Sequence, residues 1–212
     1  MTEAQAELAL QARVQLLLAQ AKRHEPLVTP LLQRLSAEVG GRMVGLEYRL
    51  KSESSTTRKL KKLLSEDPQL SVETVSIYDA LRYTIEVADE PKGQHVKAIQ
   101  AVLKGLEVEG FKVLTVKNYW TPNDNYSGVN VVLQAADGFD WELQLHTPAS
   151  VAESRRSHKL YEELRDEATT LERKRELFKE MSAPWDTIPI PDQILTEKNL
   201  HPTELIKVLP SP

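Results

Sequence analysis

The chain has 212 residues, enough for one domain with a hydrophobic core, and its 41% hydrophobic and 27% charged residues are ordinary for a soluble globular protein. The net charge of −4 disfavours DNA and anionic membranes as partners, although a local basic patch can still bind a phosphate ligand. The absence of cysteine excludes disulfides, thiolate metal sites and a cysteine nucleophile.

The first 40 residues are expected to form two helices. A stretch rich in Ala, Leu and Gln, with apolar residues at helical spacing, predicts a helix over residues 4–22. Pro26 and Pro30 predict a break, after which a second helix runs to about Val39 and ends at Gly40. The start of the chain lacks the pattern of a signal peptide, and no apolar run approaches the roughly 18 residues that a membrane-spanning helix needs.

Alternating strands and helices are expected over residues 41–182, which form the core of the fold. Before residue 121 they are strands at 43–50, 81–87 and 111–120 and helices at 54–65 and 91–109. After a loop at 121–125 come strands at 128–135 and 139–146, joined by a tight turn at Asp137-Gly138, and a helix at 150–181 that is interrupted near Thr169. A proline-rich tail over 183–212 is expected to wrap the surface or be partly disordered. The last strands have short connections and should be antiparallel, so the fold class is α+β with a mixed, largely antiparallel sheet of about five strands and helices packed on it.

The strand at 139–146 carries functional side chains on one face only. Trp141 and Leu143 point to one side of the expected sheet, and Glu142, Gln144 and His146 point to the other. A solvated strand surface is the simpler interpretation of such a face. The neighbouring clusters are what favour a functional site.

An acidic residue, Asp79, lies just before the strand that carries Arg82. Magnesium prefers one or two carboxylates and leaves room for phosphate oxygens, and an arginine can bind those oxygens with its forked guanidinium. Taken alone, Asp79 also suits a turn or cap, and Arg82 also suits an ion pair with Glu86.

Two further clusters contain groups suited to nucleotides. Cations neutralise a polyphosphate, and aromatic rings at the edge of a loop can stack a base. A solvated helix face is the alternative for the first cluster, and core packing is the alternative for the aromatic residues of the second. The first cluster is Arg49, Lys51, Ser52, Ser55, Arg58, Lys59, Lys61 and Lys62, and the second is Lys117, Asn118, Tyr119, Trp120, Asn125, Tyr126, Ser127, Gly128 and Asn130.

In this order the clusters resemble the synthetase domain of the RelA/SpoT family over roughly residues 40–165. The family has a basic segment, here Arg49-Leu-Lys51-Ser52 with Ser55 and Arg58-Lys59. It then has an aspartate and an arginine at the entrance to a strand, here Asp79-Ala-Leu-Arg82, followed by a basic strand with a tyrosine-containing loop and an E-x-Q-x-R-T strand. This chain departs from the pattern with Asn125 before the tyrosine, Asn130 in place of a histidine and His146 in place of an arginine. The departures look more like the divergent branch, which includes secreted nucleotide 3′-pyrophosphokinases and toxin domains of interbacterial effectors.

The resemblance implies transfer of pyrophosphate from ATP to the 3′-hydroxyl of a purine nucleotide, with Mg²⁺ as cofactor. Asp79 and Glu142 would hold the metal, and Glu142 would act as general base. The donor would be bound by Arg49, Lys51, Ser52, Ser55, Arg58, Lys59, Arg82 and Lys117, and the acceptor by Tyr126, Asn130, Gln144 and His146. The products would be of the (p)ppApp or (p)ppGpp type.

Several alternatives remain open at this level. In the first alternative, the acceptor is the 3′ end of tRNA, as for some toxic small synthetases. In the second, the chain is a catalytically inactive nucleotide-binding module. Transfer of AMP to a protein is less favoured, because the usual Gly-Ser entrance with paired Asp residues is missing. The resemblance further implies a secreted or delivered effector that acts in the cytoplasm, or else a cytoplasmic enzyme, and an immunity or antitoxin protein as a partner.

Overall fold

One mixed β-sheet forms the centre of the molecule, as the sequence predicts. The computed structural model describes residues 2–120, 126–166, 168–182, 184–197 and 200. Its five-stranded sheet has the order β1-β2-β5-β4-β3, in which β2 and β5 are parallel and the other neighbours are antiparallel. The strands are β1 (Arg42–Val44), β2 (Arg82–Glu86), β3 (Lys112–Asn118), β4 (Val129–Gln134) and β5 (Asp140–His146).

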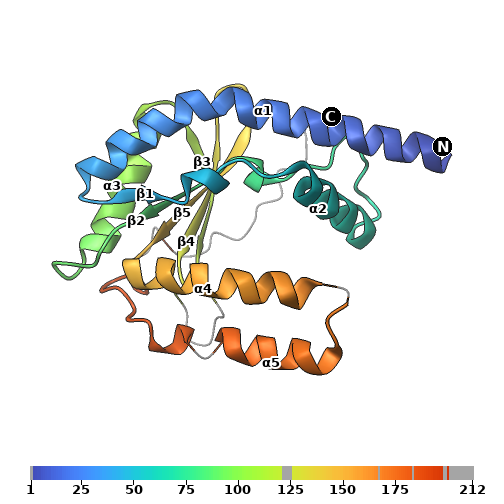
Figure 1. Cartoon of the computed structure of the whole chain (residues 1–212). Helices are drawn as coiled ribbons and strands as arrows, with labels where there is room; N and C mark the ends of the chain where they lie inside the picture. Colours follow the sequence, from blue (N-terminus) through green and yellow to red (C-terminus); the bar gives the residue numbers. More distant parts are fainter. Residues whose placement is uncertain (1, 121–125, 167, 183, 198–199, 201–212) are drawn as a thin grey trace.

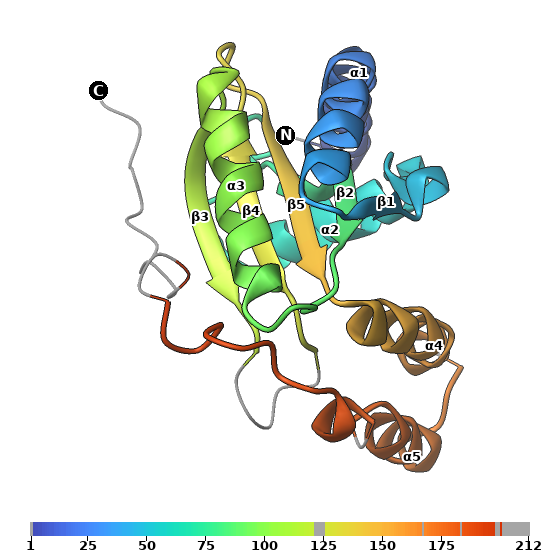
Figure 2. The same ribbon diagram turned by 90° about the vertical axis from the view of Figure 1, so that its left-hand side faces the viewer.

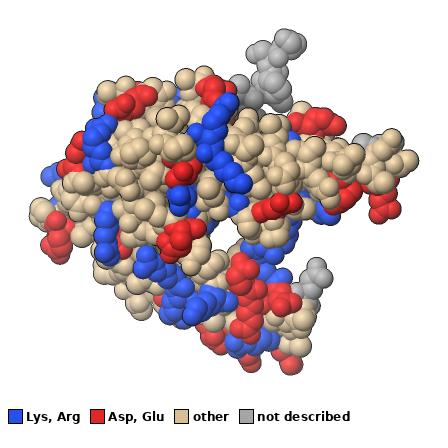
Figure 3. Space-filling model, turned by 45° about the horizontal axis from the view of Figure 1, so that its top comes forward, with Lys and Arg blue, Asp and Glu red and all other residues tan. Residues whose placement is uncertain are grey.

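The helices cover the two faces of the sheet differently. Helices α1 (Glu3–Glu38) and α3 (Gln94–Val108) lie over one face, and α2 (Glu53–Glu66) lies beyond the other (Figure 1 and Figure 2). Where β5 ends, α4 (Pro148–Arg165) begins, and it forms a hairpin with α5 (Leu171–Ser182) (Figure 1). The surface is hollowed between the main body and this hairpin, and both basic and acidic side chains rim the hollow (Figure 3).

The expected break in the first helix is wrong, because α1 continues through Pro26 and Pro30. Each proline removes one helical hydrogen bond and on average costs about 3 kcal/mol or more. Both prolines are exposed, so the carbonyls that they leave unpaired can bind water. The opposite side of α1 is buried from Leu10 to Leu35, and each fully buried aliphatic side chain contributes about 1.5–3 kcal/mol. Packing against the sheet therefore outweighs the local preference for a break.

Two other element boundaries differ from the prediction, and a glycine explains each. The strand expected over 43–50 ends at Val44, because Gly45 at φ 66° turns the chain into the short 3-10 helix Leu46–Tyr48. The helix expected from residue 91 begins at Gln94, after Gly93 at φ 81°. Both conformations lie in the left-handed region that glycine adopts without steric cost. The predicted loop at 121–125 lies outside the described residues.

The remaining predictions for the core elements are confirmed within a few residues. On β5, Trp141, Leu143 and Leu145 are buried in the same core as residues of α1 and α3, and Glu142 and Gln144 are partly buried on the opposite face. The predicted interruption near Thr169 separates α4 from α5. None of the helices in the described part of the chain is long and apolar enough to cross a membrane.

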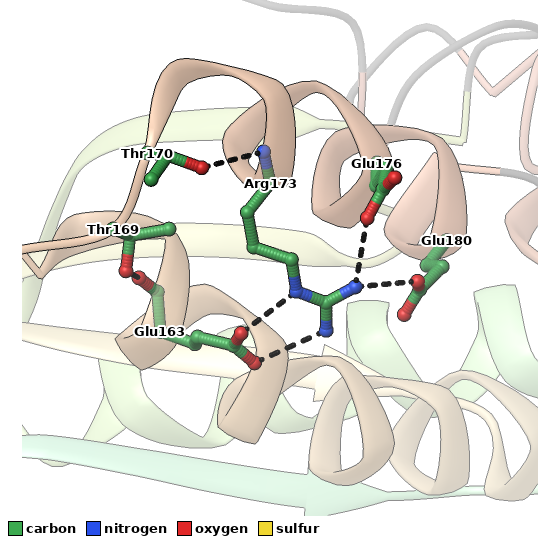
Figure 4. Close-up of polar contacts among 6 residues, drawn as sticks. All are labelled: Glu163, Thr169, Thr170, Arg173, Glu176 and Glu180. Carbon is green, nitrogen blue, oxygen red and sulfur yellow. Dashed lines mark hydrogen bonds and ion pairs between the residues drawn. The ribbon is translucent and has the colours of Figure 1, made fainter.

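Ion pairs hold the α4–α5 hairpin together (Figure 4). The Arg173 guanidinium of α5 contacts Glu163 of α4 at 2.8 Å and also Glu176 and Glu180 of its own helix. Arg156 of α4 donates to the Glu180 carbonyl at 2.9 Å. Because these contacts are exposed, each contributes little by itself, but together they join α5 to α4.

The described part of the tail wraps the surface, as expected. After the 3-10 helix Trp185–Thr187 it crosses below β3 and β4 (Figure 2). The Asn118 amide donates to the Ile194 carbonyl at 2.8 Å, and the Asp192 N–H donates to the Asp89 carboxylate at 2.8 Å. Ile194 and Leu200 are buried in the same core as the sheet, so the tail is a structural part of the fold.

Candidate active site

A carboxylate held between two lysines lies at the entrance to β2. Asp79 is nearly buried, its Oδ2 accepts from the Lys51 Nζ at 2.8 Å, and its Oδ1 accepts from the Lys59 Nζ at 2.7 Å. Burial raises the pKa of the Asp79 carboxyl, but the two lysine hydrogen bonds lower it more, so the pKa lies below its ordinary value. Asp79 is therefore an anion at neutral pH inside a small basic cage.

Backbone contacts bring this cage together from three segments. The Lys51 N–H donates to the Ala80 carbonyl at 3.1 Å and the Arg82 N–H donates to the Arg49 carbonyl at 2.8 Å, so the segment before α2 runs beside the start of β2. The Ser52 hydroxyl then accepts from the Ser55 N–H and caps α2. Capping at this point sets the direction of α2, which carries Lys59 to Asp79.

A second carboxylate, Glu142, lies on the neighbouring strand. The parallel register places Glu142 beside Arg82, and the Gln144 amide donates to the Glu142 Oε1 at 2.6 Å. Burial raises the pKa of the Glu142 carboxyl, the nearby charge of Asp79 adds to the rise, and Arg82 opposes it. The Glu142 N–H donates to the Leu81 carbonyl at 3.0 Å, two residues after Asp79, so the two carboxylates lie near each other at the start of β2.

Tyr126, the residue predicted to stack the acceptor base, is held by a chain of hydrogen bonds. Its hydroxyl donates to the Asn130 Oδ1 at 2.8 Å and contacts the His146 Nε2 at 2.7 Å. The other ring nitrogen of His146 contacts the Ser150 hydroxyl at 3.0 Å. Because Tyr126 donates to Asn130, the Nε2–H of His146 donates to Tyr126, and the Ser150 hydroxyl near Nδ1 also lies 3.1 Å from the Thr147 carbonyl.

Burial fixes His146 in its neutral form. The side chain is 2% exposed, and burial lowers the pKa of the imidazole to about 3. A Cβ on Gly128 would lie 2.6 Å from the His146 Cε1, so the ring occupies the space that any other residue would need at position 128. His146 in this position therefore requires a glycine at position 128.

Solved structures provide the comparison with known proteins. Small alarmone synthetase 2 from Bacillus subtilis matches with a TM-score of 0.55 and 18% identity, covering 80% of this chain and 89% of that one. Small alarmone synthetase 1 from the same organism matches with a TM-score of 0.52 and 18% identity over 80% and 90% of the two chains. The Type VI effector Tas1, in a complex with its immunity protein, matches with a TM-score of 0.50 and 20% identity over 81% and 94%.

The chain has the alarmone synthetase fold. The mixed sheet and its helices match that of the RelA/SpoT-like synthetase domain, as the motif order implied. No family model matches the sequence. No curated protein matches it either. The likeness is thus one of architecture, and the site must be interpreted from its own residues.

Within the synthetase fold, the predicted phosphate-binding residues occupy different environments. Lys51 and Lys59 hold Asp79, and Arg82 and Lys117 are partly buried and form no ion pair with a described residue. Arg58 is exposed beside an open depression on α2 that contains neither carboxylate, and it also lacks an ion pair within the described chain. These unpaired cations are available to an anion.

Arg49 and the two serines have structural partners. The Arg49 Nε donates to the Glu25 Oε1 of α1 at 2.6 Å, and its Nη1 donates to the Leu46 carbonyl at 2.7 Å. Ser52 and Ser55 form the cap of α2. The structure does not bring these side chains to the carboxylates, so their contribution to a site is to place Lys51 and α2.

A row of polar residues across the sheet joins the two halves of the site. In the register of the sheet, Lys117 of β3 lies opposite Asn130 of β4, Asn130 lies opposite Gln144 of β5, and Gln144 lies beside Thr84 of β2. The Gln144 side chain touches both Glu142 and Thr84. Gln144 thus lies between the lysine-held carboxylate region and the Tyr126 network.

The sequence interpretation missed three residues that support the site. Glu25 lies far along α1, and nothing in the pattern pairs it with Arg49. Ser150 is visible as the fourth residue of the capping box Thr147-Pro-Ala-Ser, but its contact with His146 requires the fold. Trp185 lies in a proline-rich tail and packs against Tyr126, with ring centroids 5.7 Å apart.

Proposed function

We propose that this protein transfers the β,γ-pyrophosphate group of ATP to the 3′-hydroxyl of a purine nucleotide. The observation that carries the proposal is the pairing of Arg82 with Glu142 on adjacent parallel strands, directly after the lysine-held Asp79. Two carboxylates and several cations at one end of a sheet suit a reaction on a polyphosphate, which needs positioning and charge neutralisation more than covalent catalysis.

The proposed step needs one base and one leaving group. Glu142 accepts the proton of the ribose 3′-hydroxyl as the oxygen attacks the β-phosphorus. The bond between the β-phosphorus and the oxygen bridging to the α-phosphorus breaks, and AMP leaves with the electron pair. A raised pKa makes Glu142 a stronger base than an ordinary carboxylate, and the amide of Gln144 orients it.

Cations in and around the site suit the triphosphate of the donor. Arg82 beside Glu142, Lys117 on β3 and the exposed Arg58 on α2 form no ion pairs with described residues, so they need not leave a carboxylate to bind phosphate. Lys51 and Lys59 hold Asp79 in the free protein and can turn to phosphate when a metal takes their place. An ammonium group binds phosphate as a point charge, whereas arginine adds two aligned donors.

Asp79 and Glu142 fit a magnesium ion that arrives with phosphates. The described residues contain no group of three or more His, Cys, Asp or Glu side chains that could hold a metal by themselves. Magnesium is commonly bound by one or two carboxylates together with substrate phosphates, which matches this donor set. When bound, the ion neutralises charge on the donor phosphates.

We further propose that the acceptor is a free purine nucleotide, with adenine accepted at least as well as guanine. Tyr126 offers any purine a stacking surface, and stacking alone discriminates poorly between bases. Discrimination requires hydrogen bonds to the base edge, because an unpaired buried polar group is costly. The Tyr126 hydroxyl is already engaged with Asn130 and His146, so it is not a dedicated reader of guanine.

A role as a delivered effector fits the same proposal. One solved structure with this fold is a Type VI effector bound to its immunity protein, and others are small alarmone synthetases. By analogy, we propose action in the cytoplasm of a target cell and an immunity protein as a partner.

The function is tested by incubating the purified protein with ATP, magnesium and each purine nucleotide in turn. The expected products are AMP and a nucleotide whose mass is greater by one pyrophosphate group, identified by mass spectrometry. A variant with Glu142→Gln serves as the inactive control. Formation of ADP and phosphate alone would contradict the proposal.

A further inference from the structure

We propose that Trp185, in the tail that follows α5, supports the acceptor site as a positioning residue for Tyr126. This inference deepens the proposed function and rests on it, because it assumes that Tyr126 binds the acceptor base. The family resemblance covers residues 40–165 and so ends before the tail. The role of Trp185 is inferred from its contact with Tyr126 in the structure.

Trp185 and Tyr126 form an aromatic cluster with residues of the sheet. The Tyr126 ring lies 5.4 Å from the Tyr119 ring at 77°, 5.3 Å from the His146 ring at 82°, and 5.7 Å from the Trp185 ring at 54°. Trp185 is 4% exposed, although it lies in a 3-10 helix of only three residues. Three neighbouring rings therefore restrict the orientation of the Tyr126 ring.

The tail is anchored on both sides of this contact. Before it, α5 is joined to α4 by the Arg156 and Arg173 contacts described above. After it, Asp192 is bound to Asp89, which also accepts from the His95 N–H at the start of α3. The Ile194 carbonyl accepts from Asn118 at the end of β3. Trp185 is thus held by the fold against the strands that frame the Tyr126 loop.

Packing, not hydrogen bonding, is the role that these contacts support. The Trp185 Nε1–H is buried without a hydrogen-bond partner among the described residues, but the same is true of Trp120 and Trp141, which lie in the core. What distinguishes Trp185 is its contact with Tyr126 from a distant part of the chain. A stacking tyrosine loses little freedom on binding when its ring is already fixed, so the base binds more tightly.

The main test compares Trp185→Ala with two matched variants. Trp185→Phe keeps an aromatic ring against Tyr126, and Ile194→Ala weakens another buried tail residue. Initial rates are measured at saturating ATP while ADP, GDP or GTP is varied, and each product is resolved by mass. We expect Trp185→Ala to raise the acceptor KM about tenfold, within the range reported for loss of base stacking, and to leave the KM for the ATP donor within about twofold.

Trp185→Phe should keep the acceptor KM within about threefold of the wild-type value, and Ile194→Ala should keep it within about twofold. An unchanged acceptor KM in Trp185→Ala would overturn the proposal, because Trp185 would then have no effect on acceptor binding. Equal rises in both KM values, or an equal effect of Ile194→Ala, would overturn it too, because each points to general loosening of the tail.

A second measurement separates this proposal from the proposed function. If no nucleotide gives product, the pyrophosphate-transfer hypothesis fails, but hydrogen exchange of the tail can still be followed in the full chain. A purine nucleotide should slow exchange over residues 184–190 in the wild-type protein and not in Trp185→Ala. Unchanged exchange in the wild-type protein on nucleotide addition would overturn a role of the tail in nucleotide binding.

Discussion

Substituting Gly128 tests the network around Tyr126 most sharply. In Gly128→Ala the new Cβ would lie 2.6 Å from the His146 Cε1 and 3.0 Å from both ring nitrogens, whereas carbon atoms in ordinary contact are about 3.5–4.0 Å apart. The imidazole cannot retreat without lengthening its bonds to Tyr126 or Ser150, which measure 2.7 and 3.0 Å. Overpacking costs about 1–3 kcal/mol, and an unpaired buried polar group costs about 1–3 kcal/mol.

We therefore expect Gly128→Ala to lower the free energy of unfolding by about 2–6 kcal/mol, measured by urea denaturation. Gly105→Ala is the matched control: its Cβ would lie 2.5 Å from a Leu35 methyl, but that methyl ends a flexible side chain and alanine favours the helix. The control should be nearly neutral. In a His146→Ala background, the cost of Gly128→Ala should fall by about 0.5–3 kcal/mol. A Gly128→Ala protein as stable as wild type, or an equal cost in both backgrounds, would refute the reasoning.

Further predictions concern the carboxylates and the histidine. Glu142→Gln should lower kcat by about 10²–10⁴-fold with an unchanged circular dichroism spectrum, and retention of most activity would show that Glu142 is not the base. Asp79→Asn should abolish both activity and its dependence on magnesium; a normal magnesium titration of an active variant would contradict the metal assignment. The pKa of His146 is lowered to about 3, so between that pH and about 6.5 the unfolded chain binds more protons and stability falls on acidification by about 1.4 kcal/mol per pH unit. His146→Gln should remove this component from the urea-derived stability, and an equal pH slope in both proteins would count against a buried neutral imidazole.

Most strands could be predicted because one face of each is apolar. The alternation in 139–146 fixed both the strand and the side of Glu142 and Gln144, and the turn at Gly138 fixed its antiparallel partner. The path of α1 could not be predicted in the same way, since Pro26 is a local signal and the packing that overrides it is tertiary. Local patterns therefore determine the elements but not how long a buried helix can continue.

The sequence predicted the site residues that lie on or next to a strand. It did not predict the contacts between segments that are far apart in the chain. Asp79, Arg82 and Glu142 lie at one end of two neighbouring strands, and their motif order already suggested this. That Arg49 pairs with Glu25 and Trp185 packs on Tyr126 depends on segments far apart in the chain. Such partners carry no periodic signal, so only the folded structure identifies them.

The most direct test of pyrophosphate transfer uses ATP as the single nucleotide. The protein is incubated with magnesium and ATP labelled at the γ-phosphate, and the products are separated and identified by mass spectrometry. Pyrophosphate transfer to ATP predicts AMP without label and a labelled adenine nucleotide carrying an added 3′-pyrophosphate, in equal amounts. Failure to form product from ATP alone would contradict the proposed adenine acceptor, and failure with every purine nucleotide added would contradict pyrophosphate transfer itself.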